Sequence, residues 1–185
     1  MPLNNRITGN SRRNQIMGGK GNDTLTGGGG PDDFIFKRGD GQDVITDVDT
    51  SYILQRFGRP SDTIWRDENG VTDVEDYSDN YGLGSIQFSQ GVNHDQLWFQ
   101  KIGQDLVIKT IGTTDSISLK NWYLADHTIG ANSPVIKASD GKVLSYGIES
   151  LVSAMSAFSP PTSGQTTLPA NYQTALSTVM AANWH

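Results

Sequence analysis

The stretch GGKGNDTLTGGGGPDDFIF, residues 18–36, sets closely spaced glycines among three aspartates and ends in an apolar run. Read in nines, residues 18–26 and residues 27–35 both fit the pattern G-G-x-G-x-D-x-U-x, in which U is a large apolar residue. A flexible glycine-rich linker would not keep an acid at the sixth position and an apolar residue at the eighth. A phosphate-binding loop would need G-x-x-x-x-G-K-[ST], whereas Lys20 is followed by Gly21. The stretch is therefore an internal repeat with a nine-residue period.

Partial copies flank the two good repeats. Residues 9–17 keep a glycine first, an asparagine sixth and an apolar residue eighth. Residues 39–45 repeat the turn again, but two extra residues precede them. The apolar positions of the series are Ile16, Leu25, Phe34 and Ile45.

Each nine divides into a glycine-rich turn and a short strand. Glycine permits positive φ in the turn, and the three residues x-U-x form a strand that points U inward. Two nines complete one coil, so turns two repeats apart stack at roughly the 4.8 Å strand spacing. Their carboxylates and carbonyls then converge, and such hard oxygen donors suit Ca²⁺, which takes six to eight oxygens at about 2.3–2.6 Å. The repeats predict a parallel β-roll that binds calcium in its turns.

These residues resemble the RTX, or haemolysin-type calcium-binding repeat, family, whose nonapeptides wind into a parallel β-roll. The resemblance implies that each ion lies between two turns that are two repeats apart, bound by turn carbonyls and sixth-position aspartates. One implied site consists of Gly19, Gly21 and Asp23 with Arg38, Asp40 and Asp43. A second consists of Asn10, Arg12 and Asn14 with Gly27, Gly29 and Asp32. A third would combine Gly28, Gly30 and Asp32 with Asp47 or Asp49.

The sequence departs from the family pattern in three places. The two-residue insertion lies inside the first implied site. In the second, Arg12 occupies a glycine position that can demand positive φ, and neutral Asn14 replaces a carboxylate.

Residues 86–123 resemble the domain that often follows haemolysin-type repeats in large secreted bacterial proteins. Independently, alternating apolar and polar residues over 86–119 predict an antiparallel β meander. We expect its aromatic residues to form a core, with a sugar-stacking platform as the alternative. These residues are Trp98, Phe99, Trp122 and Tyr123.

Residues 51–84 form an acidic insertion, with seven acids against three arginines. The spacing around Asp67 and Gly70 does not fit an EF-hand loop. We expect this segment to be either a further metal-binding loop or an insertion that faces solvent or a partner.

The C-terminal residues 150–185 contain no Asp, Glu, Lys or Arg. Apolar spacing predicts helices near residues 147–158 and from about residue 169 to residue 182. The second helix places Leu168, Tyr172, Leu176, Val179 and Met180 on one face. An ordinary docked helix would explain this pattern, whereas the family resemblance implies an uncleaved signal for type I secretion.

The composition limits the classes of partner that the protein is expected to bind. The chain has 185 residues, 20 acids against 14 Lys and Arg, and a net charge of −6, which argues against a nucleic-acid surface or an anionic membrane. It contains no cysteine, which excludes disulfides and thiolate metal sites. The sequence shows neither a signal peptide nor a run of about 18 apolar residues.

Catalysis is not expected. The histidines are His94, His127 and His185, and neither G-x-S-x-G nor H-E-x-x-H occurs. Carboxylate pairs such as Asp73 and Asp76 lie in the polar insertion, where no cleft is evident. The sequence therefore predicts a protein that is not an enzyme.

The expected fold is mainly β. A calcium-binding β-roll in residues 1–50 and the insertion in 51–84 precede an antiparallel β domain in 85–146, and one or two helices follow in 147–185. With the resemblance, this order predicts a non-catalytic C-terminal module of a large secreted protein. The module would fold on binding calcium outside the cell and be exported by type I machinery. The alternative is an adhesin or carbohydrate-binding module whose partner is a glycan or a cell-surface ligand.

Overall fold

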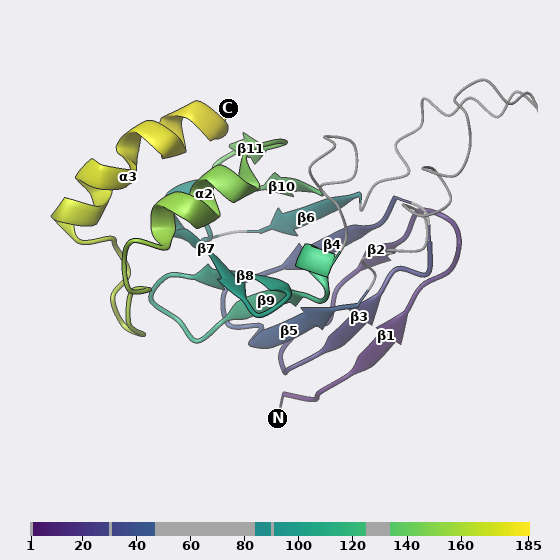
Figure 1. Ribbon diagram of the computed structural model, residues 1–185. Helices are drawn as coiled ribbons and strands as arrows, with labels where there is room; N and C mark the ends of the chain where they lie inside the picture. The colour runs from purple at the N-terminus through teal and green to yellow at the C-terminus, as the bar shows by residue number, and fades with distance from the viewer. Residues whose placement is uncertain (1, 30, 47–83, 90, 125–133) are drawn as a thin grey trace, which may run out of the picture.

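The computed structural model describes residues 2–29, 31–46, 84–89, 91–124 and 134–185 (Figure 1). In these residues, strands β1 to β11 form two mixed sheets, and two α-helices follow at the C-terminus. The mainly β fold with C-terminal helices is thus confirmed. The acidic insertion lies outside the described residues apart from its last position, Gly84.

The strands of the repeat region are β1 (Arg6–Thr8), β2 (Gln15–Ile16), β3 (Thr24–Thr26), β4 (Asp33–Phe36) and β5 (Gln42–Ile45). The later strands are β6 (Ser85–Phe88), β7 (Leu97–Ile102), β8 (Asp105–Thr110), β9 (Ser116–Leu119), β10 (Val135–Lys137) and β11 (Val143–Leu144). The helices are α2 (Ile148–Met155) and α3 (Ala170–Asn183), with short 3-10 segments η1 (His94–Gln96) and η2 (Trp122–Leu124).

Successive strands of the repeat region alternate between the two sheets. β1, β3 and β5 lie side by side in one sheet, β2 and β4 lie in the other, and all of these pairs are parallel. Leu25 pairs with Ile45 across β3 and β5, so side chains two repeats apart stack between the sheets. All four predicted apolar positions are buried, which confirms the nine-residue register.

The roll continues beyond the glycine-rich repeats. β6 pairs in parallel with β4, β9 pairs in parallel with β5, and β10 pairs in parallel with β6. The predicted antiparallel meander is confirmed for β7, β8 and β9, but the prediction was wrong for β6. An alternating pattern shows which side of a strand is buried but not which strand it joins. Ile86 packs beside Phe34 and so adds a rung to the roll.

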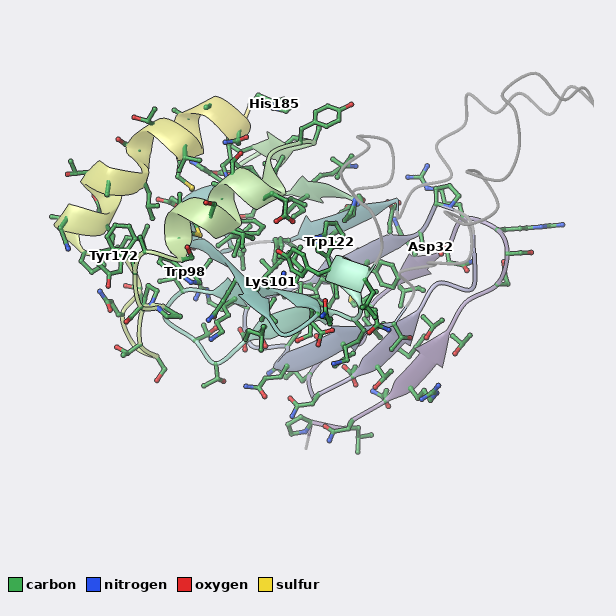
Figure 2. All side chains as sticks on the ribbon, viewed as in Figure 1. Asp32, Trp98, Lys101, Trp122, Tyr172 and His185 are labelled. Carbon is green, nitrogen blue, oxygen red and sulfur yellow. The ribbon has the colours of Figure 1, made fainter. Side chains whose placement is uncertain are left out.

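The hairpin of β7 and β8 and the two helices lie at the end of the molecule away from β1 (Figure 1). Trp98, Phe99 and Trp122 are buried there, so the prediction of an aromatic core is confirmed, and Tyr123 is partly buried. Trp98 faces Tyr172 of α3, with ring centroids 6.1 Å apart (Figure 2).

Both predicted C-terminal helices are present. α2 places Leu151 and Met155 against the core, and α3 contributes Leu176 and Met180. Among the described residues, no helix has the length and apolarity needed to cross a bilayer.

Candidate metal centre

Four turns connect the strands of the repeat region. Turn A (residues 9–14) links β1 to β2, and turn B (18–23) links β2 to β3. Turn C (27–32) links β3 to β4, and turn D (37–43) leads from β4 into β5. Because successive strands alternate between sheets, turns A and C lie on one side of the roll and turns B and D on the other. The predicted stacking of turns two repeats apart is confirmed.

Turns B and D are in direct contact. The Gly21 amide donates to the Asp40 carbonyl at 2.7 Å, and the Asp23 amide donates to Asp43 Oδ1 at 2.9 Å. The structure therefore brings together the two halves of the first implied site.

The two-residue insertion does not distort turn D. It lengthens β4 to four residues, where β3 has three. Gly39 then matches Gly19, with φ of +88° and +84°, and Gly41 and Gly21 both keep positive φ. Turn D thus repeats the backbone path of turn B, because glycine adopts these angles without a steric cost.

The sixth-position side chains form the same hydrogen bond three times. Asp23 Oδ1 accepts from the backbone N–H of Asn5 at 2.6 Å. Asp43 Oδ1 accepts from the backbone N–H of Asp23 in the same way. Asp32 Oδ1 accepts from the backbone N–H of Asn14 at 2.7 Å. Each carboxylate thus reaches back to the preceding turn on its own side, which fixes its orientation toward the space between turns.

Asp23 is the side chain whose surroundings best fit a cation ligand. Its side chain is 1% exposed, and among the described residues Oδ2 has no hydrogen-bond partner. Burying half of a carboxylate without a partner is costly, and a cation bound at that oxygen would remove the cost. A Cβ at Gly18 would collide with Oδ2, so the glycine at the first position of turn B leaves room for the carboxylate.

Burial and neighbouring acids raise the pKa values of both aspartates of turn D. Burial, together with the charges of Asp23, Asp40 and Asp115, raises the pKa of Asp43 to about 7. The pKa of Asp40 is also raised, chiefly by burial. Asp40, Asp43 and Asp115 line one small pocket between turn D and the start of β9. At Asp40 and Asp43 a proton or a cation would therefore relieve the cost of burying negative charge.

Sequence reasoning missed Asp115, because it lies outside the glycine-rich repeats. Its Oδ2 accepts from the Gly39 amide at 2.7 Å, so it contacts turn D from the next rung of the same sheet. The available signal was an acid one residue before a strand, directly after the turn-forming IGTT.

Turns A and C also lie side by side, with different chemistry. Asn14 Oδ1 accepts from the Asn10 amide at 2.7 Å, so the asparagine closes its own turn. Arg12 does not have positive φ, so a non-glycine residue fits there. Gly27 adjoins Gly9 across the turns. Gly28 and Gly29 have φ of +90° and +99°. Gly30, Asp47 and Asp49 lie outside the described residues.

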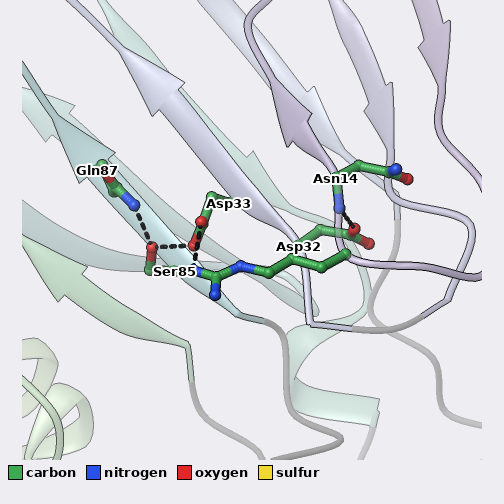
Figure 3. A network of polar contacts seen from close by, with 6 residues as sticks. Asn14, Asp32, Asp33, Ser85 and Gln87 are labelled. Atoms are coloured by element: carbon green, nitrogen blue, oxygen red, sulfur yellow. Dashed lines mark hydrogen bonds and ion pairs between the residues drawn. The ribbon is translucent and has the colours of Figure 1, made fainter.

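Asp32 and Asp33 are adjacent but have different roles (Figure 3). Asp33 Oδ1 accepts from Ser85 Oγ at 2.6 Å, and its Oδ2 pairs with Arg13 at 2.8 Å. Burial alone would raise the pKa of Asp33, but the hydrogen bonds from Ser85 and Arg13 lower it overall. Asp33 therefore links turn A to β6, and Asp32 remains the candidate ligand of turn C.

An additional turn precedes β1. The Leu3 amide donates to the Lys20 carbonyl at 3.2 Å, and the Asn22 amide donates to Asn4 Oδ1 at 2.8 Å. Sequence reasoning missed this rung, although Asn5 and Ile7 have the spacing of the sixth and eighth positions.

Side chains alone do not complete an ion site. Among the described residues, no three His, Cys, Asp or Glu side chains converge closely enough to hold a metal. The resemblance implies that backbone carbonyls of the turns supply the remaining oxygens. The donors available, carboxylates and carbonyls, are the types that Ca²⁺ prefers.

Part of the repeat region matches a known protein family. Residues 2–34 match the model of the RTX calcium-binding nonapeptide repeat, which describes four copies. The match contains β1 to β3 and turns A to C, and it ends within β4.

Proposed function

We propose that the chain is a non-catalytic module of a larger secreted protein and that this module folds on meeting calcium outside the cell. Its RTX-type calcium-binding repeats support this function. The observation that carries the proposal is the buried, half-partnered carboxylate of Asp23, beside the raised pKa of Asp43. Such a pair opposes folding at neutral pH unless a cation is bound.

The residues of turns B and D would hold the ion. Asp23 and Asp43 supply carboxylates, while Gly19, Gly21, Arg38 and Asp40 contribute through their backbone. When bound, calcium supplies the positive charge that these carboxylates lack. In the unfolded chain the turns are not stacked, so the free energy of binding becomes free energy of folding.

The expected affinity agrees with folding outside the cell. Extracellular calcium modules have dissociation constants of about 10⁻⁴–10⁻³ M. Sites of this kind stay empty in a cytosol with far less calcium, so the chain would leave the cell unfolded. The uncharged C-terminal segment would then serve as the signal for type I export machinery.

Both described histidines have contacts with neighbouring residues. His94 pairs with Asp140 at 2.6 Å, and its ring packs 5.7 Å from that of Trp184. His185 exchanges backbone hydrogen bonds with Val143. His127, Asp73 and Asp76 lie outside the described residues.

An adhesin or glycan-binding module is the alternative function. Sugar binding by stacking on the aromatic residues of the strands loses support, because Trp98, Phe99 and Trp122 are buried. A glycan array probed with and without calcium separates the two functions, since reproducible calcium-dependent binding would favour adhesion.

A calcium titration tests the leading proposal. We expect calcium to raise both the strand signal in circular dichroism and the melting temperature. The double variant Asp23→Ala/Asp43→Ala should lose most of this response. Asp95→Ala is the matched control, because Asp95 is an exposed acid of η1. Wild-type protein that ignores calcium, or a double variant that responds like wild type, would contradict the proposal.

A further inference from the structure

Turn D differs from the other turns at the first position of the nonapeptide pattern. Turns A, B and C begin with Gly9, Gly18 and Gly27, whereas the matching residue of turn D is Arg38. The partly buried Arg38 side chain points away from turn B. Its guanidinium donates to the Gly91 carbonyl at 2.9 and 3.1 Å, to the Ile111 carbonyl at 3.1 Å and to Gln96 Oε1 at 2.9 Å.

These three partners flank the β7–β8 hairpin. Gly91 and Gln96 precede β7, and Ile111 directly follows β8. The Ile111 amide also donates to the Gln96 carbonyl at 2.9 Å, so the two ends of the hairpin are joined where Arg38 binds.

A second set of contacts ties turn D to the same region. Gly39 donates its amide to Asp115 Oδ2 at 2.7 Å, and the Ser116 amide donates to the Gly41 carbonyl at 3.0 Å. One side of turn D therefore faces the candidate ion site with turn B, and the other side is bound to the hairpin.

We propose that Arg38 is a positioning residue that couples ion binding between turns B and D to docking of the β7–β8 hairpin. The inference rests on the proposed calcium binding. Turn D has to be ordered for either event, so whichever event occurs first lowers the entropic cost of the other. By linkage the effect is reciprocal, because a docked hairpin raises calcium affinity by the factor with which calcium favours docking.

The chemistry of arginine fits this role. Its planar guanidinium presents several N–H donors in fixed directions, so one side chain can bind Gly91, Gln96 and Ile111 together. Lysine keeps the charge but lacks the planar fork. The backbone carbonyl of residue 38, which the family pattern uses for the ion, is present in every variant.

Hydrogen exchange with mass spectrometry tests the coupling. In wild-type protein, calcium should slow exchange both in residues 18–46 and in residues 91–116. In Arg38→Gln, calcium should still protect residues 18–46, but protection of residues 91–116 should be lost. The calcium concentration at half-saturation should rise about fivefold or more, the lower end of typical allosteric couplings. Arg6→Gln, at an exposed arginine of β1, is the matched control and should behave like wild type.

The outcomes separate this inference from the proposed function. One outcome is that calcium still slows exchange in residues 91–116 of Arg38→Gln, with the calcium affinity of the wild type. In that case the coupling role of Arg38 is wrong, while calcium binding stands. If wild-type protein shows no calcium response in residues 18–46, both fail. Should Arg38→Gln not fold, Arg38→Lys gives the same comparison, and transmission retained in that variant would overturn the inference.

Discussion

Asp43 is the residue at which burial and charge conflict most. Its side chain is 2% exposed, and burial together with the charges of Asp23 and Asp40 raises its pKa to about 7. The hydrogen bond from the Asp23 amide offsets only part of this effect. Without calcium, the folded protein therefore holds a proton here that the unfolded chain releases near its ordinary pKa of 3.8.

This difference gives calcium-free protein a defined pH dependence. Between pH 4 and about 7 the folded state binds more protons than the unfolded state, so the free energy of unfolding should fall as pH rises. The strand signal in circular dichroism of calcium-depleted protein at pH 5 and pH 8 measures the change in the folded fraction. We expect lower stability at pH 8.

Asp43→Asn is the control for this prediction. The amide keeps an acceptor for the Asp23 amide but does not titrate, so the difference between pH 5 and pH 8 should shrink. An equally steep dependence in Asp43→Asn would show that other groups cause it.

Among the elements, the strands of the repeats were the most predictable. The nine-residue pattern is local, so the buried face of β2 to β5 could be predicted directly from the sequence. The rungs β6, β9 and β10 could not, because their partners are separated from them by long insertions and alternation does not identify a partner strand. Local reasoning instead assigned neighbouring strands to each other, which holds for β7, β8 and β9.

The candidate site was predictable to the same extent. The repeat pattern placed Asp23 and Asp43 in stacked turns, and the structure brings them together. It gave no information on Asp115 or on the direction of the Arg38 side chain, because both depend on contacts with residues outside the repeats.

The stacked apolar column of the roll predicts the effect of a core deletion. Leu25 of β3 is fully buried against Ile45, so Leu25→Ala should lower the free energy of unfolding by about 2–5 kcal/mol. The measurement is urea denaturation with calcium present. Met17, which is 43% exposed, provides the control Met17→Ala, with an expected change near zero. Equal effects of the two substitutions would contradict the inward register of Leu25.

At the scale of the whole molecule, the C-terminus is built into the core. Trp184 is 4% exposed and packs against His94 and Phe99, with ring centroids 5.7 and 6.4 Å away. His185 then exchanges two backbone hydrogen bonds with Val143 of β11. The last residues of the chain thus help to hold α3 against the sheets.

Removing the Trp184 ring should therefore destabilise the protein. Trp184→Ala is expected to cost about 3–5 kcal/mol in the free energy of unfolding, the usual range for a buried aromatic. Denaturant unfolding measures it, and Tyr146→Ala, at an aromatic that is 68% exposed, is the control. A Trp184→Ala variant as stable as this control would show that the C-terminus does not contribute to the core.

We infer that stacked turns pool their oxygens around calcium and so stabilise the roll. A crystal structure of the protein grown with calcium tests it most directly, with anomalous scattering to identify the ion. We expect an ion between turns B and D, bound by Asp23 and by turn carbonyls at about 2.3–2.6 Å. Ordered turns without an ion at saturating calcium would contradict it.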